Sequence, residues 1–131
     1  MILPYGEKLP RSSGGLFRDD MHIRFHKELA AGRWFELSLM EQLGNIGSEV
    51  ERAINWSRKG NGEYSRLAFY RALELIDLTL RDPKHRGRLR EIARVREALA
   101  DYFAFSNEYH TTEAQWRKYF HSFAFAARLG R

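Results

Sequence analysis

The 131-residue sequence contains no cysteine, and this absence excludes several classes of function. A disulfide scaffold, an iron–sulfur cluster, a thiolate zinc site and a cysteine nucleophile all require that residue. The sequence also lacks any apolar run that approaches the roughly 20 residues of a membrane-spanning helix. Its first residues lack the basic-then-apolar order of a secretion signal. We therefore expect a cytoplasmic protein that does not associate with a membrane.

Proline is scarce, and no stretch alternates apolar and polar residues with a period of two, so we expect no β-sheet. The three prolines are at positions 4, 10 and 83. Two of them fall in residues 1–18, which also contain glycine and serine and which we expect to form an irregular N-terminal arm. Residues 19–131 are expected to form a single helical-bundle domain, because their number is ordinary for one domain.

Apolar residues recur with helical spacing in four segments. The expected helices span about 33–58, 63–81, 83–105 and 112–129, and a short extra helix at about 20–31 is compatible with the pattern. Gly44 and Gly47 lie inside the first of them, where we expect close packing against a neighbouring helix; a kink or the approach of a ligand is the alternative. Four such helices with short connections predict an all-α fold, an antiparallel four-helix bundle.

Two of the expected helix starts carry capping signals. Asp82 followed by Pro83 is typical of an N-cap residue with proline at the first helical position. Thr112 and Gln115 have the spacing of a capping box, in which each side chain binds the backbone amide of the other residue. These signals fix where the last two helices are expected to begin.

The net charge of +5 is concentrated in one segment. Residues 1–80 and residues 97–131 each contain equal numbers of basic and acidic residues, whereas residues 81–96 contain seven basic and two acidic ones. A local excess of this kind attracts polyanions. Arg86, Arg90 and Arg94 lie on one face of the expected third helix, where like charges one turn apart do not stabilise the helix. We expect this row to bind a phosphate backbone; a solvated face is the alternative.

A second basic row is expected on the last helix, opposite its aromatic side. It consists of Arg117, His121 and Arg128. We count these residues with the first row as candidates for nucleic-acid binding, with a plain outer face as the alternative.

Arg96 differs from the other basic residues because it falls within the apolar sector of the expected third helix. A buried arginine needs an acidic partner. Glu51, Glu74 and Asp77 are on helix flanks from which a carboxylate can reach it. We expect a buried ion pair that fixes the register of the helices, and a buried charge with a functional role is the alternative.

We expect no catalytic site, no cofactor and no metal ion. The Glu-x-x-His pairs of bundle di-iron sites are absent. His22 and His26 have a spacing that lets two imidazoles bind one ion, but the further ligands are missing, so we interpret them as surface histidines. A Gly-x-Ser-x-Gly motif and a phosphate-binding glycine loop are also absent.

Half of the 18 aromatic residues lie between positions 102 and 125. Most of them fit a helical core. Phe125, however, points away from Trp116 and Phe120 on the expected last helix. We expect Phe125 to join an interface between copies of the chain, and stacking on a base is the alternative.

The middle of the chain has the layout of a helical hairpin. Three features define it: Asn45-Ile46-Gly47-Ser48-Glu49, the Gly-Asn break at 60–61 and the stretch from Tyr64 to Leu80. This layout, over about residues 40–105, resembles the middle hairpin of two bacterial families of small basic four-helix bundles, the ribosomal-RNA intervening-sequence proteins and the accessory proteins of diversity-generating retroelements. The resemblance implies an oligomeric bundle whose basic surface engages nucleic acid, with Arg86, Arg90 and Arg94 as the positions concerned.

A second comparison is with the HEPN ribonucleases, whose signature is an arginine, four to six residues and a histidine. Arg81 with His85 and Arg117 with His121 are similar, but each pair has only three residues between its members. The sequence therefore leaves three functions open. The main hypothesis is a non-enzymatic, oligomeric bundle that binds RNA or DNA. The alternatives are a protein-interaction or self-assembly module, with a partner that the sequence does not identify, and a HEPN-like ribonuclease.

Overall fold

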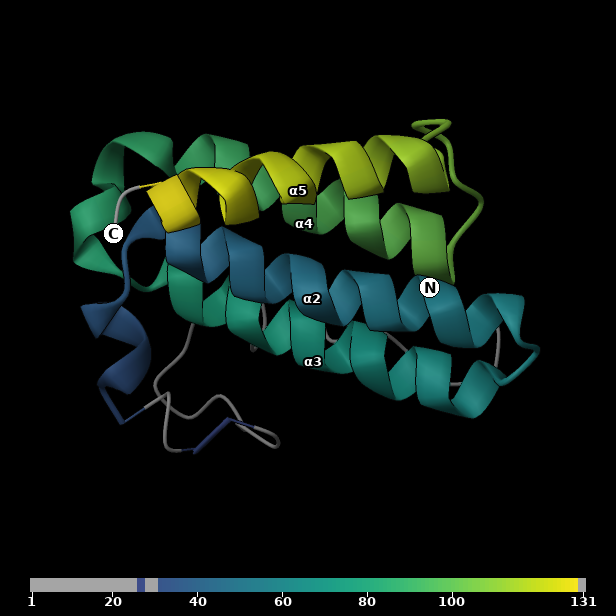
Figure 1. Cartoon of the computed structure of the whole chain (residues 1–131). Coiled ribbons are helices and arrows are strands. Elements are labelled where there is room, and N and C mark those ends of the chain that lie inside the picture. The colour runs from purple at the N-terminus through teal and green to yellow at the C-terminus, as the bar shows by residue number, and fades with distance from the viewer. Residues whose placement is uncertain (1–25, 28–30, 130–131) are drawn as a thin grey trace.

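The computed structural model describes residues 26–27 and 31–129, and this part of the chain is almost entirely helical, without strands. The expected arm at 1–18 and most of the expected helix at 20–31 lie outside the described residues. The prediction of an all-α bundle is confirmed. The elements, in chain order, are the 3₁₀ helix η2 (Arg33–Glu36), α2 (Leu39–Arg58), α3 (Gly62–Leu80), the 3₁₀ helix η3 (Pro83–Arg88), α4 (Leu89–Ala104) and α5 (Glu113–Leu129) (Figure 1).

Contacts between the helices show that neighbouring helices run in opposite directions. Glu51 on α2 contacts Arg117 on α5, and Gly44, earlier on α2, lies beside Ala124, later on α5. Figure 1 shows the chain reversing at each connection. The same reversed order holds for Ala53 with Ser65 and Glu49 with Arg71 between α2 and α3, and for Phe69 with Phe103 and Asp77 with Arg96 between α3 and α4.

The four helices do not pack equally closely. α2 packs along both α3 and α5, and α4 packs on α3, whereas α4 and α5 make little backbone contact with each other. α4 and α5 are joined at one end by the connection over residues 105–112 (Figure 1). The seam between α4 and α5 is therefore the least closed of the bundle.

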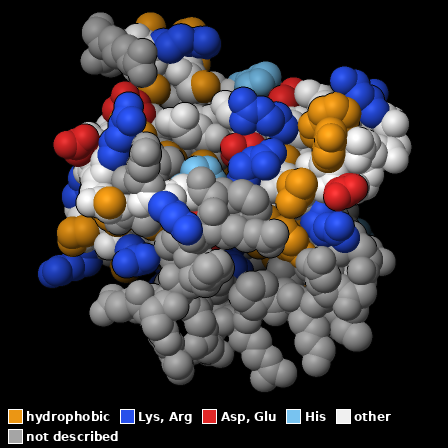
Figure 2. Space-filling view, turned by 90° about the horizontal axis from the view of Figure 1, so that it is seen from below, with side chains coloured by type: hydrophobic (Ala, Val, Ile, Leu, Met, Phe, Trp, Pro, Cys, Tyr) orange, Lys and Arg blue, Asp and Glu red, His pale blue; other side chains and the backbone are white. Residues whose placement is uncertain are grey.

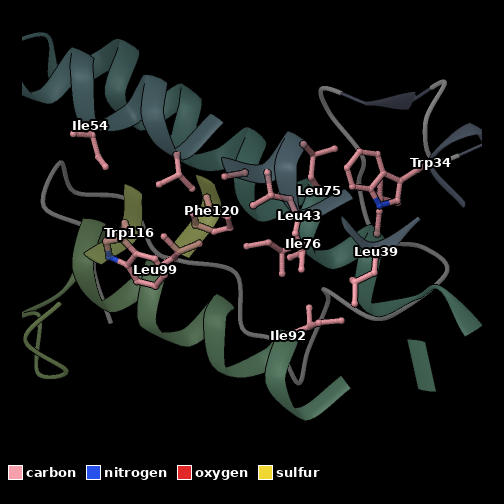
Figure 3. Close-up of a cluster of buried hydrophobic side chains, with 14 residues drawn as sticks. Trp34, Leu39, Leu43, Ile54, Leu75, Ile76, Ile92, Leu99, Trp116 and Phe120 are labelled. Carbon is pink, nitrogen blue, oxygen red and sulfur yellow. The ribbon is translucent and has the colours of Figure 1, made fainter. Parts of the chain in front are cut away.

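The core is built from the apolar stripes that the helical spacing predicted. Ile46 on α2, Ile76 on α3 and Leu99 on α4 are completely buried, and Trp116 and Phe120 contribute the α5 side (Figure 3). Burial of one large apolar side chain stabilises a fold by about 1.5–3 kcal/mol. These side chains come from all four helices and form one of two clusters of buried residues in the described part of the chain.

Gly44 and Gly47 allow α5 to approach α2 closely, as predicted. A Cβ atom on Gly47 would lie only 2.5 Å from the Cβ atom of Phe120, and one on Gly44 would lie 3.4 Å from the Cα atom of Ala124. Contacts under 3 Å between such atoms force a displacement of the neighbour. Gly47 therefore sets the position of α5 on α2, whereas a Cβ atom on Gly44 would make an ordinary van der Waals contact.

The first expected helix, 33–58, is divided, and the prediction of a continuous helix from Arg33 is wrong. α2 begins after Ser38, whose hydroxyl accepts a hydrogen bond from the amide of Glu41 at 3.1 Å. The Glu41 carboxylate accepts a hydrogen bond from the amide of Ser38 at 3.0 Å. This capping box satisfies the free amides of a new helix start, and Arg33 lies in η2 instead.

The third expected helix, 83–105, is also divided. The Asp82 side chain caps η3 by accepting a hydrogen bond from the amide of Lys84, as the Asp-Pro signal indicated. His85 and Arg88 then leave the helical conformation, and α4 begins at Leu89. Leu89 has the helical spacing of the buried Ile92 but is itself 37% exposed. Arg86 therefore lies on η3, and the prediction that it shares one continuous helix face with the later arginines is wrong.

The start of α5 agrees with its predicted capping box. The amide of Thr112 donates to Oε1 of Gln115 at 2.9 Å, and the amide of Gln115 donates to Oγ1 of Thr112 at 3.2 Å. The two side chains thus satisfy backbone amides at a helix start, as the spacing of these residues predicted.

Candidate nucleic-acid interface

The structure divides the basic residues of segment 81–96 into paired and unpaired ones. Arg86, Arg90 and Arg94 are exposed, and no residue in the described part of the chain forms a hydrogen bond or ion pair with them. The donors of these three arginines therefore face no carboxylate within the described residues. By contrast, three others are in ion pairs: Lys84 with Asp82, Arg88 with Glu91 and Arg96 with Asp77.

Arg90 and Arg94 lie one turn apart on α4, at the edge of a groove between α4 and α5. The groove has a volume of about 460 Å³. It exists because α4 packs on α3 and α5 packs on α2, while α4 and α5 make little contact with each other. We call it the α4–α5 groove; its other lining residues are Gly87, Arg88, Glu91, Val95 and Tyr119.

Tyr119 supplies the α5 side of this groove. Its ring is partly buried and meets the ring of Phe123 edge-on at 4.9 Å and that of Phe120 at 5.1 Å. Burial raises the pKa of Tyr119 to about 12, with a further rise from the nearby Glu91 carboxylate and an opposing effect of Arg88. The hydroxyl is therefore protonated at neutral pH, and the groove combines a basic wall with an aromatic one.

Arg88 adds less to the basic wall than its position suggests. Its Nη2 atom donates to both carboxylate oxygens of Glu91, at 2.9 and 2.7 Å. Hydrogen bonding to Glu91 also raises the pKa of Arg88. The pair is close to neutral overall, so the unpaired positive charge of the groove comes from Arg90 and Arg94.

A buried polar network holds η3 against the bundle, and the sequence analysis missed it. Nε2 of Gln42 donates to the backbone oxygen of Trp34 and to Oδ2 of Asp82, both at 3.0 Å. Oε1 of Gln42 lies 2.5 Å from Nε2 of His85. Lys84 donates to Asp82 and, at 2.8 Å, to the backbone oxygen of Phe35. The signal in the sequence was a glutamine within the apolar sector of α2.

Ionisation in this network favours a neutral histidine and a charged carboxylate. Burial lowers the pKa of His85, although the nearby Asp82 carboxylate opposes this shift. Burial alone would raise the pKa of Asp82, but hydrogen bonds from Lys84 and Gln42 hold it below its ordinary value. Neutral His85 donates through Nε2 to Gln42, since both donors of the Gln42 amide are already used. The network anchors the segment that leads into α4.

Arg96 is buried, and its partner is Asp77. Nε of Arg96 donates to Oδ1 of Asp77 at 2.8 Å. Of the three acidic residues considered as partners, Glu51 and Glu74 instead contact other side chains. Nη2 of Arg96 is buried without a hydrogen-bond acceptor in the described residues. Burial raises the pKa of Asp77 to about 6 even though Arg96 opposes the shift. The pair lies between α3 and α4 and links them.

Arg117, from the second basic row, is engaged by acidic residues and is not free for phosphate. Its Nε atom donates to both carboxylate oxygens of Glu51, at 2.8 and 3.0 Å. Its Nη2 atom donates to Oδ1 of Asn55 at 3.0 Å, and its Nη1 atom lies 3.5 Å from the Glu113 carboxylate. Arg117 therefore ties α5 to α2.

The structure does not bring the second basic row together as a free surface. His121 and Arg128 are exposed on α5, but Arg117 is occupied by α2. The HEPN-like ribonuclease hypothesis requires an arginine and a histidine that both reach RNA. In the Arg117–His121 pair, the arginine is bound to α2 instead. In the other Arg–His pair, His85 is buried against Gln42.

The face of the molecule on the side of α3 has a different charge pattern. Figure 2 shows it from below, and in the visible part Lys and Arg side chains are spread among acidic and apolar ones. Arg71 on α3 lies 3.3 Å from Glu49 on α2. Arg71 on this face is therefore compensated by a carboxylate.

Comparison with known proteins identifies no relative: no protein-family model, no curated protein and no solved structure matches this chain. Among the described residues, no group of three or more His, Asp or Glu is placed to hold a metal ion. His22 lies outside them, and His26 contacts Glu74. No helix in the described ranges is long and apolar enough to cross a membrane.

Proposed function

We propose that this protein is a non-enzymatic nucleic-acid-binding bundle that contacts phosphates through Arg90 and Arg94, with Arg86 extending the contact along η3. The observation that carries the proposal is the division of segment 81–96. Arg86, Arg90 and Arg94 are exposed and make no ion pair with any described residue, while Lys84, Arg88 and Arg96 of the same segment are paired.

Unpaired arginines suit this role for a physical reason. A guanidinium binds phosphate oxygens with two parallel hydrogen bonds, and no internal carboxylate has to be displaced first. Each phosphate contact also releases counterions from the nucleic acid, which favours binding at low salt.

The test is the triple variant R86E/R90E/R94E, which reverses the charge of all three side chains. Fluorescence anisotropy with labelled single-stranded RNA, single-stranded DNA and duplex DNA is measured at low and at physiological salt. We expect the variant to bind at least tenfold more weakly at low salt. For duplex DNA, the slope of log affinity against log salt concentration should be smaller in magnitude by about 2 to 3. Each lost phosphate contact reduces the magnitude of this slope by about 0.9.

A charge-matched control separates the row from the effect of net charge. K27E/R33E/K59E makes the same change in charge at three exposed positions outside the α4–α5 groove. We expect this control to bind nearly as the wild type does. Equal losses in both triple variants, or no loss in R86E/R90E/R94E, would contradict the proposal. Circular dichroism of each variant reports whether the helices are retained.

Self-assembly is a second candidate function, because α5 carries exposed apolar side chains near its end. Phe125 is 57% exposed and Leu129 is 71% exposed, one turn further along the same helix. Exposed apolar pairs of this kind are typical of interfaces between protein chains. We propose that they meet a second copy of the chain. Sedimentation velocity should show an oligomer for the wild type and a monomer for F125D/L129D; a monomeric wild type would remove this candidate.

A further inference from the structure

The α4–α5 groove differs from a simple basic surface because an aromatic ring lies across from the arginines. Tyr119 and Val95 line it together with Arg90 and Arg94. A duplex presents its phosphates on a convex surface and keeps the faces of its bases stacked inside, so a ring within a groove contributes little to duplex binding. A single strand exposes base faces that aromatic side chains can stack on.

The ring of Tyr119 is held in place before any ligand arrives. It packs edge-on against three neighbouring rings on α5: Trp116 at 6.3 Å, Phe120 at 5.1 Å and Phe123 at 4.9 Å. A side chain that is already ordered loses little conformational entropy on binding, which favours affinity. These contacts make Tyr119 a fixed element of the groove wall.

The arginines have a spacing that suits one strand. Four residues of α-helix rise about 6 Å, so the Cα atoms of Arg90 and Arg94 are about that far apart along one wall, and each carries a long side chain that ends in a guanidinium group. Successive phosphates of a single strand have a similar separation. A strand that follows α4 can therefore place two phosphates on the arginines and turn a base toward Tyr119.

We infer that the α4–α5 groove selects single-stranded nucleic acid, with Tyr119 against an unstacked base and Arg90 and Arg94 on the adjoining phosphates. This inference rests on the proposed function and specifies its ligand. RNA and DNA single strands share the chemistry that the groove recognises, so both are included in the test, and duplex binding is one of its outcomes.

The experiment compares Y119L, Y119F and R90E/R94E with the wild type. The probes are labelled oligo-rU, labelled oligo-dT, a duplex with the same number of phosphates per strand, and an abasic oligodeoxynucleotide of the same length. Because base stacking on an aromatic side chain is a substantial part of single-strand affinity, we expect Y119L to bind oligo-rU and oligo-dT about tenfold more weakly. Y119F keeps the ring and should therefore lose much less affinity for both strands than Y119L does.

The probes distinguish failure of this inference from failure of the proposed function. The wild type should prefer oligo-dT over both the duplex and the abasic strand, and Y119L should lose that preference. If R90E/R94E loses binding while Y119L keeps the full preference for oligo-dT, the phosphate contacts stand and the role of Tyr119 is wrong. If the wild type binds the duplex as tightly as oligo-dT, single-strand selection is wrong. If R90E/R94E binds every probe normally, both proposals fail.

Photocrosslinking keeps the inference testable if Y119L does not fold. Wild-type protein is irradiated with an oligonucleotide that carries 5-iodouracil and is then digested with trypsin. Cleavage after Lys118 and Arg128 releases a peptide that spans residues 119–128. We expect the crosslink in this peptide, at Tyr119 by fragmentation. A crosslink that maps only to other peptides would overturn the inference.

Discussion

Two arginine rows on the surface of this bundle differ in what faces them. On α4, Arg90 and Arg94 border a groove and contact no acidic residue in the described part of the chain. On α5, Arg117 lies against α2, where Glu51 and Asn55 bind its guanidinium. The two helices look alike as sequences, since each carries basic residues opposite an apolar seam. The neighbouring helix decides which arginine holds the fold together and which can bind a ligand.

The difference follows from how closely each helix packs. Glycines on α2 allow α5 to approach, so that the Glu51 carboxylate on α2 reaches Arg117 on α5. α4 makes little contact with α5, whose single carboxylate, Glu113, faces Arg58 and Arg117 instead, so none meets the outer arginines of α4. A guanidinium with a nearby carboxylate is already compensated, whereas an unpaired one retains its attraction for a phosphate.

Breaking the buried pair should have the largest effect. D77L removes the carboxylate that faces Arg96, and an arginine cannot lose its proton to avoid a buried charge. We expect a loss of about 3–5 kcal/mol in the free energy of unfolding, measured by urea denaturation. R96M should lower the free energy of unfolding by less than D77L does, because Asp77 can take up a proton. Burial already raises the pKa of Asp77 to about 6. The double variant D77L/R96M should regain most of the free energy of unfolding that D77L loses.

The pH dependence of R96M provides a check on this explanation. Without Arg96, the pKa of Asp77 should rise further, because the guanidinium lowers it in the wild type. A folded-state pKa above the ordinary value means that the contribution of Asp77 to stability is complete below about pH 3.8 and is lost as pH rises through the folded-state pKa. R96M should therefore be less stable at pH 8 than at pH 5. If R96M and D77L lower the free energy of unfolding equally at both pH values, this explanation is wrong.

Removing the paired surface arginine should separate stability from binding. R117M loses the contacts to Glu51 and Asn55, so we expect a melting temperature lower by a few degrees at most, since exposed ion pairs contribute little. Its affinity for oligo-dT should stay within about twofold of the wild type. R90E/R94E should show the opposite behaviour, with an unchanged melting temperature and weak binding. If R117M weakens binding as strongly as R90E/R94E does, the two rows do not differ as the structure indicates.

The sequence predicted features that depend on one helix. The apolar stripe of α2, the capping box of Thr112 and Gln115 and the close packing at Gly47 all follow from spacing within a segment. The exposure of Arg90 and Arg94 followed in the same way. Periodicity within one helix carries this information because it fixes which residues share a face.

The features that the sequence did not predict depend on contacts between segments. The break before α4 is accompanied by the burial of His85 against Gln42, a residue on another helix. The occupation of Arg117 comes from Glu51, which is 66 positions away. The α4–α5 groove exists because two neighbouring helices stay apart. None of these can be read from spacing, since they depend on the order and distance at which the helices pack.

The smallest effect, and the sharpest comparison, should come from turning a paired arginine into an unpaired one. E91Q removes the carboxylate that holds Arg88 at the edge of the α4–α5 groove. We expect the affinity for oligo-dT at low salt to rise by a few-fold. The slope of log affinity against log salt concentration should become steeper by up to about 0.7, the value for one added phosphate contact on a single strand. The melting temperature should change little, because both side chains are exposed.

E97Q is the matched control for this last variant, since it makes the same charge change on α4 at a residue that does not line the groove. Glu97 is exposed and accepts only a long hydrogen bond, 3.3 Å, from the Tyr109 hydroxyl. If release of Arg88 causes the gain, E91Q should exceed E97Q in both affinity and salt dependence. Equal gains would mean that the overall field of α4 attracts the strand, and that pairing of individual arginines does not matter. A gain confined to E91Q shows that the arginine itself makes the new contact.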